Sequence, residues 1–129
     1  MKIINLPIKT KTKHYSVIIG SNIIQNISKL LYYQNINFEK CLIVIDKNIP
    51  IKFRNNLTKN LKSKKKIFYI FNANEKNKSY KSIDKIQNIL FKYRFNREDC
   101  LIAYGGGITG DVVGFTASIF KRGIKFINI

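Results

Sequence analysis

The chain has 129 residues, of which 45% are hydrophobic and 24% charged, so it is long enough and apolar enough for one domain with a buried core. No apolar run approaches the roughly 18 residues that a membrane helix requires, and the N-terminus lacks the apolar stretch of a secretory signal. We therefore expect no membrane association and a cytoplasmic location.

The net charge of +17 raises the question of a nucleic-acid partner, because clustered Lys and Arg bind phosphate backbones. Nearly all of the excess is lysine, and Ile and Asn are abundant alongside it. This combination favours mutational bias in the coding sequence over a nucleic-acid interface. The densest run, residues 62–66, lies where a solvated turn is expected.

Apolar runs predict six short strands, and helix-length segments with apolar residues at helical spacing lie between the later ones. The predicted strands are Lys2–Leu6, His14–Ile19, Cys41–Ile45, Lys66–Phe71, Cys100–Tyr104 and Lys125–Ile129, and the predicted helices are Asn22–Tyr33, Ile49–Leu61, Ser79–Tyr93 and Ile108–Lys121. Strands that alternate with helices indicate parallel βαβ units. We expect one α/β domain: a Rossmann-like, mostly parallel sheet with helices on both faces.

Three segments follow consecutive predicted strands and are therefore expected at one edge of the sheet. Asp46 and Asn48 follow the third strand, residues 72–78 the fourth, and residues 105–111 the fifth. In open parallel sheets, ligands bind at the carboxyl ends of the strands. The sequence thus predicts that these three segments surround a ligand.

Three consecutive glycines, Gly105 to Gly107, form the most informative motif. They join an apolar strand to an apolar helix, and glycine lets a ligand approach the backbone closely. The helix start then presents free N–H groups to an anion. A tight turn without a ligand is the alternative, although three glycines are entropically costly for a turn alone.

The polar residues near this edge are ambiguous when taken singly. Asp111 either stabilises the helix by interacting with the positive end of its dipole or accepts hydrogen bonds from a cofactor. Asp46 and Asn48 either start a turn or hold ribose hydroxyls. Glu75 and Lys78 form either a solvated ion pair or a second clamp on the nucleoside.

Arg122, just after the predicted helix Ile108–Lys121, is either an exposed arginine at the helix end or a planar guanidinium that binds a carboxylate or phosphate. Cys41 and Cys100 each begin an apolar strand, and His14 is the only histidine. Because a zinc site needs about four clustered N, S or O ligands, no metal site is expected. Both cysteines are expected to be reduced thiols.

Together these motifs resemble the N-terminal domain of the 3-dehydroquinate synthase family. The resemblance is most specific in Gly105-Gly-Gly-Ile-Thr-Gly-Asp-Val-Val-Gly-Phe-Thr-Ala117 and Lys121-Arg-Gly123, which follow the family's Gly-Gly-Gly-x-x-Gly-Asp-x-x-Gly-Phe-x-Ala…Arg-Gly. Tyr15-Ser-Val-Ile-Ile-Gly-Ser21, Val44-Ile-Asp-Lys-Asn48 and Glu75-Lys-Asn-Lys-Ser79 resemble three further family segments.

The resemblance implies an enzyme of the shikimate pathway that cyclises 3-deoxy-D-arabino-heptulosonate 7-phosphate to 3-dehydroquinate with loss of phosphate, using NAD. It implies that Arg122 contacts the sugar-phosphate substrate. It leaves a homodimer open for full-length relatives. The residues that it assigns to NAD are Asp46, Asn48, Glu75, Lys78, Gly105, Gly106, Gly107, Ile108 and Asp111.

The sequence departs from the family pattern in two ways. Asn74 replaces a glycine before Glu75, and we expect the loop to survive because Asn tolerates the left-handed conformation. The sequence also stops at Ile129, where the family continues into a helical C-terminal domain with metal ligands (Zn or Co) and substrate-binding lysines. We therefore expect residues 1–129 to be an incomplete NAD-binding domain that is inactive alone.

Two other functions remain open from the sequence. The charge would suit a basic nucleic-acid or anion-binding module. A related sugar-phosphate cyclase or a glycerol dehydrogenase relative would share the glycine triplet, but related dehydrogenases lack the Gly-Phe-x-Ala…Arg-Gly continuation.

Overall fold

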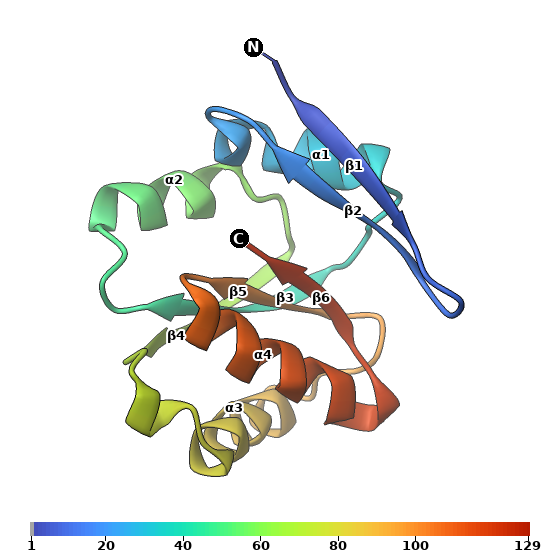
Figure 1. The fold of residues 1–129 in the computed structure, drawn as a ribbon. Helices are drawn as coiled ribbons and strands as arrows, with labels where there is room; N and C mark the ends of the chain where they lie inside the picture. The colour runs from blue at the N-terminus through green and yellow to red at the C-terminus, as the bar shows by residue number, and fades with distance from the viewer. Residues whose placement is uncertain (1) are drawn as a thin grey trace. The chain divides into compact units, whose positions relative to one another are not determined.

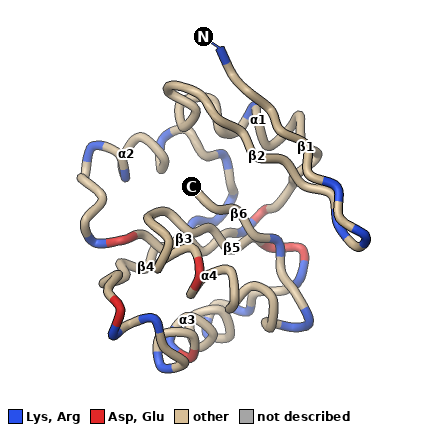
Figure 2. Tube along the Cα trace, viewed as in Figure 1, with Lys and Arg blue, Asp and Glu red and all other residues tan. Residues whose placement is uncertain are grey.

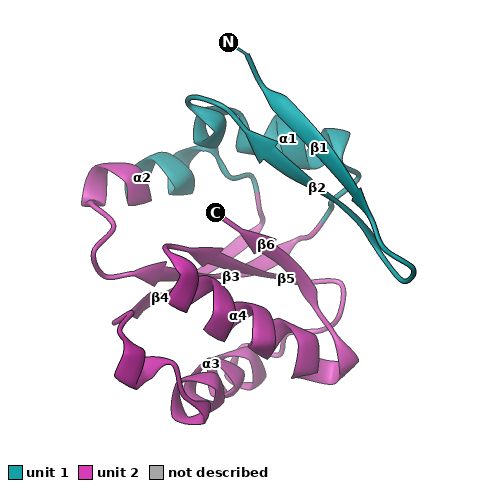
Figure 3. Ribbon diagram, in the orientation of Figure 1, with its two compact units in different colours: residues 1–37, 55–62 teal, residues 38–54, 63–129 magenta. Residues whose placement is uncertain are grey.

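A computed structural model describes residues 2–129 of the chain, which form six strands, four α-helices and three short 3-10 helices (Figure 1). By their contacts they divide into two compact units, residues 1–37 with 55–62 and residues 38–54 with 63–129 (Figure 3). The elements in chain order are β1 (Ile4–Lys9), β2 (His14–Ile19), η1 (Ile23–Asn26), α1 (Ile27–Tyr33), β3 (Lys40–Asp46), α2 (Ile51–Asn60), β4 (Lys65–Phe71), η2 (Glu75–Asn77), α3 (Tyr80–Lys92), β5 (Cys100–Tyr104), α4 (Gly107–Ile119), η3 (Phe120–Arg122) and β6 (Lys125–Asn128).

The first unit begins with an antiparallel hairpin of β1 and β2, in which Ile4 pairs with Ile19. The Thr10 amide donates to the Lys13 carbonyl at 2.8 Å, and the Thr10 hydroxyl accepts from the Lys13 amide at 3.0 Å. This turn extends β1 to Lys9, so the predicted strand Lys2–Leu6 begins and ends too early. The hairpin forms a two-stranded sheet of its own, separate from the parallel sheet.

The helical part of the first unit is divided, whereas the sequence predicts a single helix. Asn22 adopts a left-handed conformation with φ 54°, and the 3-10 helix η1 then precedes α1. The Ser28 hydroxyl donates to the Asn60 carbonyl at 2.7 Å and accepts from the Lys62 amide at 2.8 Å. One serine on α1 thus satisfies backbone groups at the end of α2.

The second unit is a four-stranded parallel sheet in the order β4-β3-β5-β6. Every residue of β5 and nearly every residue of β3 is buried, as expected for the central strands of a parallel sheet. The edge strand β4 alternates between more and less exposed residues. The α/β class and the parallel sheet predicted from the sequence are confirmed.

Helices α3 and α4 lie on the same side of this sheet (Figure 1), and α4 packs against β3, β5 and β6. Gly110 and Gly114 allow this close approach, because a Cβ on Gly110 would lie 3.0 Å from the Asn128 side chain and one on Gly114 would lie 3.2 Å from the Phe126 ring. The core between helices and sheet contains Leu42, Val44, Ile86, Leu90, Phe95, Leu101, Val113 and Phe120.

Basic residues are distributed along both units rather than confined to one segment (Figure 2). In the described part of the chain, four lysines form ion pairs with carboxylates. None of the helices formed by residues 2–129 combines the length and the apolar character needed to cross a bilayer.

Cys41 and Cys100 face each other in register on β3 and β5, both are fully buried, and both are free thiols. Burial raises the pKa of the Cys41 thiol from 9.0 to about 11 and raises the pKa of Cys100 further.

We expect neither thiol to react with iodoacetamide at pH 8 in the folded chain, and both to react after unfolding in guanidinium, as counted by mass spectrometry. Because only the unfolded chain ionises these thiols near pH 9, their contribution to stability is complete below that pH and is lost as the pH rises. Rapid alkylation of the folded chain would contradict the expectation that both thiols are unreactive there.

Candidate functional site

The three segments predicted to surround a ligand lie at one edge of the second unit. They follow β3, β4 and β5, which are neighbours in the sheet and parallel, so their carboxyl ends lie together. The backbone links the first of these segments to the end of β4, because the Lys47 amide donates to the Phe71 carbonyl at 2.8 Å. As the sequence predicts, the three segments therefore lie together at the carboxyl edge of the sheet.

Asp46 ends β3 and organises the turn that follows it. Its Oδ1 accepts from the Asn48 amide at 3.0 Å and from the Asn48 side-chain Nδ2 at 3.2 Å. This is the Asx turn expected of an aspartate at a strand end. Asp46 and Asn48 therefore form the predicted turn, which leaves the ribose-binding prediction untested, and Asp46 is half-buried at the edge.

The glycine triplet forms the turn between β5 and α4, and its three members differ in their surroundings. A Cβ on Gly105 would lie 2.8 Å from Thr109 Oγ1 and 2.9 Å from Asp46 Cβ, so only glycine fits there. Cβ atoms on Gly106 and Gly107 would meet no atom within 4 Å. Gly106 is the N-cap of α4, with no side chain capping the helix. The helix start therefore faces open space with free N–H groups, as an anion site requires.

Thr109 lies beneath this turn, and no motif in the sequence marks it as a site residue. Its side chain is fully buried, and its Oγ1 has no hydrogen-bond partner among the described residues. The only signal in the sequence is a hydroxyl residue within an apolar helix.

The segment after β4 is held by its own asparagines. Asn74 caps η2 by accepting from the Asn77 amide at 3.0 Å, and Asn77 Nδ2 donates to the Asn72 carbonyl at 2.8 Å. The loop survives as predicted, but not for the reason given: Asn74 has φ −151°, which is extended, so no left-handed conformation is needed there. Asparagine is accommodated there because its side chain caps the turn.

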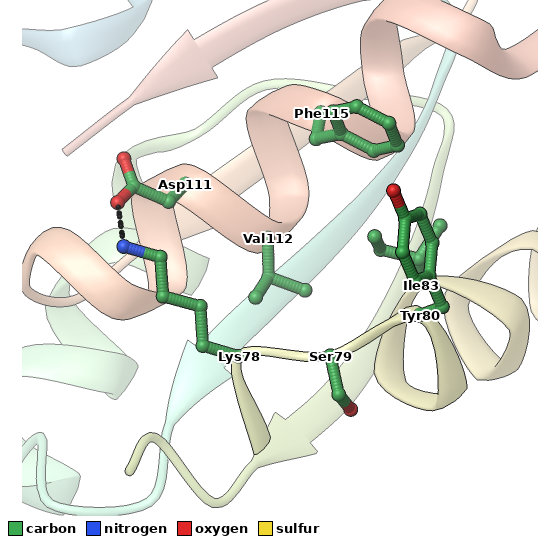
Figure 4. Close-up of a pocket in the computed structure, with 7 residues that line it drawn as sticks. All are labelled: Lys78, Ser79, Tyr80, Ile83, Asp111, Val112 and Phe115. Carbon is green, nitrogen blue, oxygen red and sulfur yellow. Dashed lines mark ion pairs between the residues drawn. The ribbon is translucent and has the colours of Figure 1, made fainter. Parts of the chain in front are cut away.

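Lys78 and Asp111 form an ion pair, with Lys78 Nζ 2.8 Å from Asp111 Oδ2 (Figure 4). This hydrogen bond and the Asp111 charge, with a smaller effect from Glu75, raise the pKa of Lys78. The ion pair considered between Glu75 and Lys78 is thus replaced by the Lys78–Asp111 pair, which joins two different elements.

The helix dipole explains Asp111 less well than the sequence suggests. Because α4 begins at Gly107, Asp111 lies in the second turn of the helix and not in the first, where the dipole effect is strongest.

A hollow of about 300 Å³ adjoins this ion pair, between the start of α3 and α4 (Figure 4). Ser79, Tyr80, Ile83, Val112 and Phe115 line it together with the two charged residues. The Tyr80 and Phe115 rings meet edge to face, with centroids 6.2 Å apart. The hollow therefore has charged groups at one end and apolar and aromatic groups at the other.

Arg122 lies elsewhere. It is exposed in η3, beyond the C-terminal end of α4, whereas the glycine turn lies at the N-terminal end. A helix of 13 residues spans about 20 Å. Arg122 therefore does not share the cluster formed by Asp46, the glycine turn and Asp111 within one chain.

Neutralising Asp111 tests whether the ion pair serves binding rather than stability. Because both partners are about half exposed, we expect Asp111→Asn to leave the unfolding midpoint unchanged. We expect it to weaken dinucleotide binding several-fold, measured by titration with NAD. Asp84→Asn, which removes an exposed carboxylate from α3, is the control and should bind as the unaltered chain does. Equal affinity of both variants would show that Asp111 does not contact the ligand.

Among residues 2–129, no three His, Cys, Asp or Glu side chains lie close enough together to hold a metal ion. The acidic residues at the sheet edge are instead engaged separately, Asp46 with Asn48 and Asp111 with Lys78.

Comparison with known proteins shows sequence relatives along the whole chain. A sequence model of the 3-dehydroquinate synthase N-terminal family matches residues 68–129. The chain is 51% identical to a 3-dehydroquinate synthase from Pelagibacter ubique over all 129 residues, and 42% identical to one from Prochlorococcus marinus over 118 residues. It spans 35% and 32% of these two relatives, about a third of their length. The resemblance to the N-terminal part of these enzymes is therefore confirmed.

Solved structures show the same fold. A crystal structure of 2-deoxy-scyllo-inosose synthase, also solved in complex with carbaglucose-6-phosphate, NAD+ and Co2+, matches 98% of the chain with a TM-score of 0.86 and 20% identity. The chain covers 35% of that protein. A 2-epi-5-epi-valiolone synthase from Streptomyces hygroscopicus with NAD+ and Zn2+ bound matches 70% of the chain, with a TM-score of 0.60.

Proposed function

We propose that the chain forms the dinucleotide-binding part of a 3-dehydroquinate synthase, acting in the cytoplasm. The reaction is the NAD-dependent conversion of 3-deoxy-D-arabino-heptulosonate 7-phosphate to 3-dehydroquinate with loss of phosphate. One observation supports it above the others: Asp46, the uncapped start of α4 and the Lys78–Asp111 pair meet at one sheet edge. Similarity along all or most of the chain to about a third of two enzymes of that name supports the choice of reaction.

The residues at this edge fit a dinucleotide. The open space over Gly106 and Gly107 leaves room for a diphosphate against the backbone, where the first amides of α4 can donate to it. The buried hydroxyl of Thr109 lacks a partner in the described chain, which is consistent with a site that is completed by ligand binding.

In this proposal the side chains bind and orient the cofactor. Asp46 and Asn48 hold one ribose through its hydroxyls, Gly105 to Ile108 hold the diphosphate, and Glu75, Lys78 and Asp111 hold the second nucleoside. When bound, NAD would take up a hydride from a ring carbon and return it after phosphate has left. Lys78, oriented by its ion pair with Asp111, places a positive charge beside the second nucleoside.

A divalent metal does not fit the residues that the structure describes. The relatives of known structure were solved with Co2+ or Zn2+, but residues 2–129 bring no ligand set together. Inactivity of the chain on its own stays a prediction, and formation of 3-dehydroquinate by purified residues 1–129 would contradict it.

Arg122 is proposed to contact the sugar-phosphate substrate. Since it lies about 20 Å from the glycine turn along α4, it would act outside the cluster of its own chain, which a homodimer would allow. Its planar guanidinium suits a phosphate or carboxylate.

Titration of the 15N-labelled chain with NAD tests the cofactor assignment, because NMR detects binding even at millimolar dissociation constants. We expect the amide signals of Asp46–Asn48, Lys78 and Gly105–Asp111 to shift together along one binding curve. Absence of binding, or shifts confined to the amino ends of the strands, would contradict the proposal.

The same chain provides a test of the nucleic-acid alternative. Because its basic residues are distributed over the fold, we expect DNA or RNA affinity within the non-specific range of about 10⁻⁴–10⁻⁶ M at physiological salt, falling steeply as salt is added. Fluorescence anisotropy with a labelled oligonucleotide measures it. Affinity well beyond that range would favour a nucleic-acid-binding protein instead.

A further inference from the structure

Two buried threonines of α4 differ in their hydrogen bonding. Thr116 is fully buried, and its hydroxyl donates to the Val112 carbonyl at 2.8 Å. Thr109, two turns earlier, is equally buried, but its Oγ1 has no hydrogen-bond partner among the described residues. A buried hydroxyl without a partner costs free energy that a valine of the same shape would not.

The unpartnered hydroxyl points at the underside of the glycine turn. Thr109 Oγ1 lies 2.8 Å from the point where a Gly105 Cβ would be, and Asp46 Cβ lies 2.9 Å from the same point. Thr109 and Asp46 thus pack against the same side of Gly105. The arrangement therefore brings a charged acceptor, the Asp46 side chain, close to the Thr109 hydroxyl.

The Asp46 carboxylate has capacity for another donor. Its Oδ1 accepts both hydrogen bonds from Asn48, whereas a carboxylate offers about four acceptor positions on two oxygens. Rotation about its Cβ–Cγ bond is soft, so the carboxylate can turn without moving the strand. A ribose that donates to Asp46 would compete with Asn48 for Oδ1 and would favour such a turn.

We propose that Thr109 is a positioning residue: when a dinucleotide binds, its hydroxyl donates a hydrogen bond to the Asp46 carboxylate and holds it against the glycine turn. This inference rests on the proposed function, because it requires that Asp46 bind a ribose. Thr109 does not touch the ligand itself, since it lies beneath the turn. It couples the residue that binds the ribose to the turn that binds the diphosphate.

Three substitutions test the hydroxyl. We expect Thr109→Val to weaken NAD binding about tenfold, the effect of one lost hydrogen bond to a charged group, while its thermal stability equals or exceeds that of the unaltered chain. Thr109→Ser keeps the hydroxyl and should bind NAD within about twofold of the unaltered chain. Thr116→Val removes a buried hydroxyl from the same helix and should leave NAD affinity unchanged.

The outcomes separate this inference from the function on which it rests. If the unaltered chain and Thr109→Val bind NAD equally well, the inference is wrong and the proposed function stands. If Val and Ser weaken binding equally, the methyl packing matters rather than the hydroxyl, and the inference is again wrong. If the unaltered chain binds no NAD, both are wrong. Should Thr109→Val fail to fold, the Ser and Ala variants, which differ only in the hydroxyl, provide the same comparison.

Discussion

Replacing Gly105 with alanine is expected to destabilise the chain by about 1–3 kcal/mol, the usual cost of forcing an extra methyl group into a packed site. The new Cβ would lie 2.8 Å from Thr109 Oγ1 and 2.9 Å from Asp46 Cβ, and neither neighbour is the free end of a long side chain. Either the turn or the start of α4 must move. Because the same movement displaces Asp46, NAD affinity should fall at least tenfold. Urea denaturation and NAD titration measure the two effects.

The neighbouring glycine provides the matched control. A Cβ on Gly106 meets no atom within 4 Å, so Gly106→Ala should leave the unfolding free energy within about 0.5 kcal/mol of the unaltered value. Its methyl group would nevertheless occupy the space assigned to the diphosphate, so NAD binding should fall as strongly as in Gly105→Ala. Unimpaired NAD binding by Gly106→Ala would show that the diphosphate does not lie over this turn.

The strands and the position of the site follow from local patterns in the sequence. The runs His14–Ile19 and Cys100–Tyr104 match the observed strands at both ends, because each is a short apolar segment bounded by turn residues. Neighbouring parallel strands with polar residues at their carboxyl ends fix where a ligand edge must be. For this reason the sequence alone predicts that Asp46 and the glycine turn lie at the same edge of the sheet.

Contacts between distant segments do not follow from local patterns. The sequence predicts Lys78 beside Glu75, three residues away, but its ion-pair partner is Asp111 on another element. Arg122 is assigned to the substrate by its motif alone, which carries no information on how far α4 separates it from the glycine turn. The buried state of Thr109 depends on how α4 packs against the sheet, and the spacing of apolar residues does not specify that packing.

Replacing Phe95 with alanine should cost about 3–5 kcal/mol, the largest stability effect that we expect from a single side chain. Phe95 is fully buried, its amide donates to the Leu90 carbonyl at 2.9 Å, and Arg94 before it is left-handed with φ 53°. This is the geometry of a Schellman cap, in which the residue after the left-handed position packs against the helix that it ends. Lys40 Nζ also lies 4.8 Å from the centroid of the Phe95 ring.

Two variants distinguish the cap from a general loss of aromatic surface. Phe91 is 58% exposed, so Phe91→Ala should cost only about 1 kcal/mol, or well under half of the Phe95→Ala effect. Arg94→Gly removes the penalty of a left-handed non-glycine residue and should stabilise the chain by about 0.5–1 kcal/mol, even though it deletes a charge. Urea denaturation of the three variants measures these differences. Equal losses for Phe91→Ala and Phe95→Ala, or a loss for Arg94→Gly, would mean that α3 does not end in the cap described here.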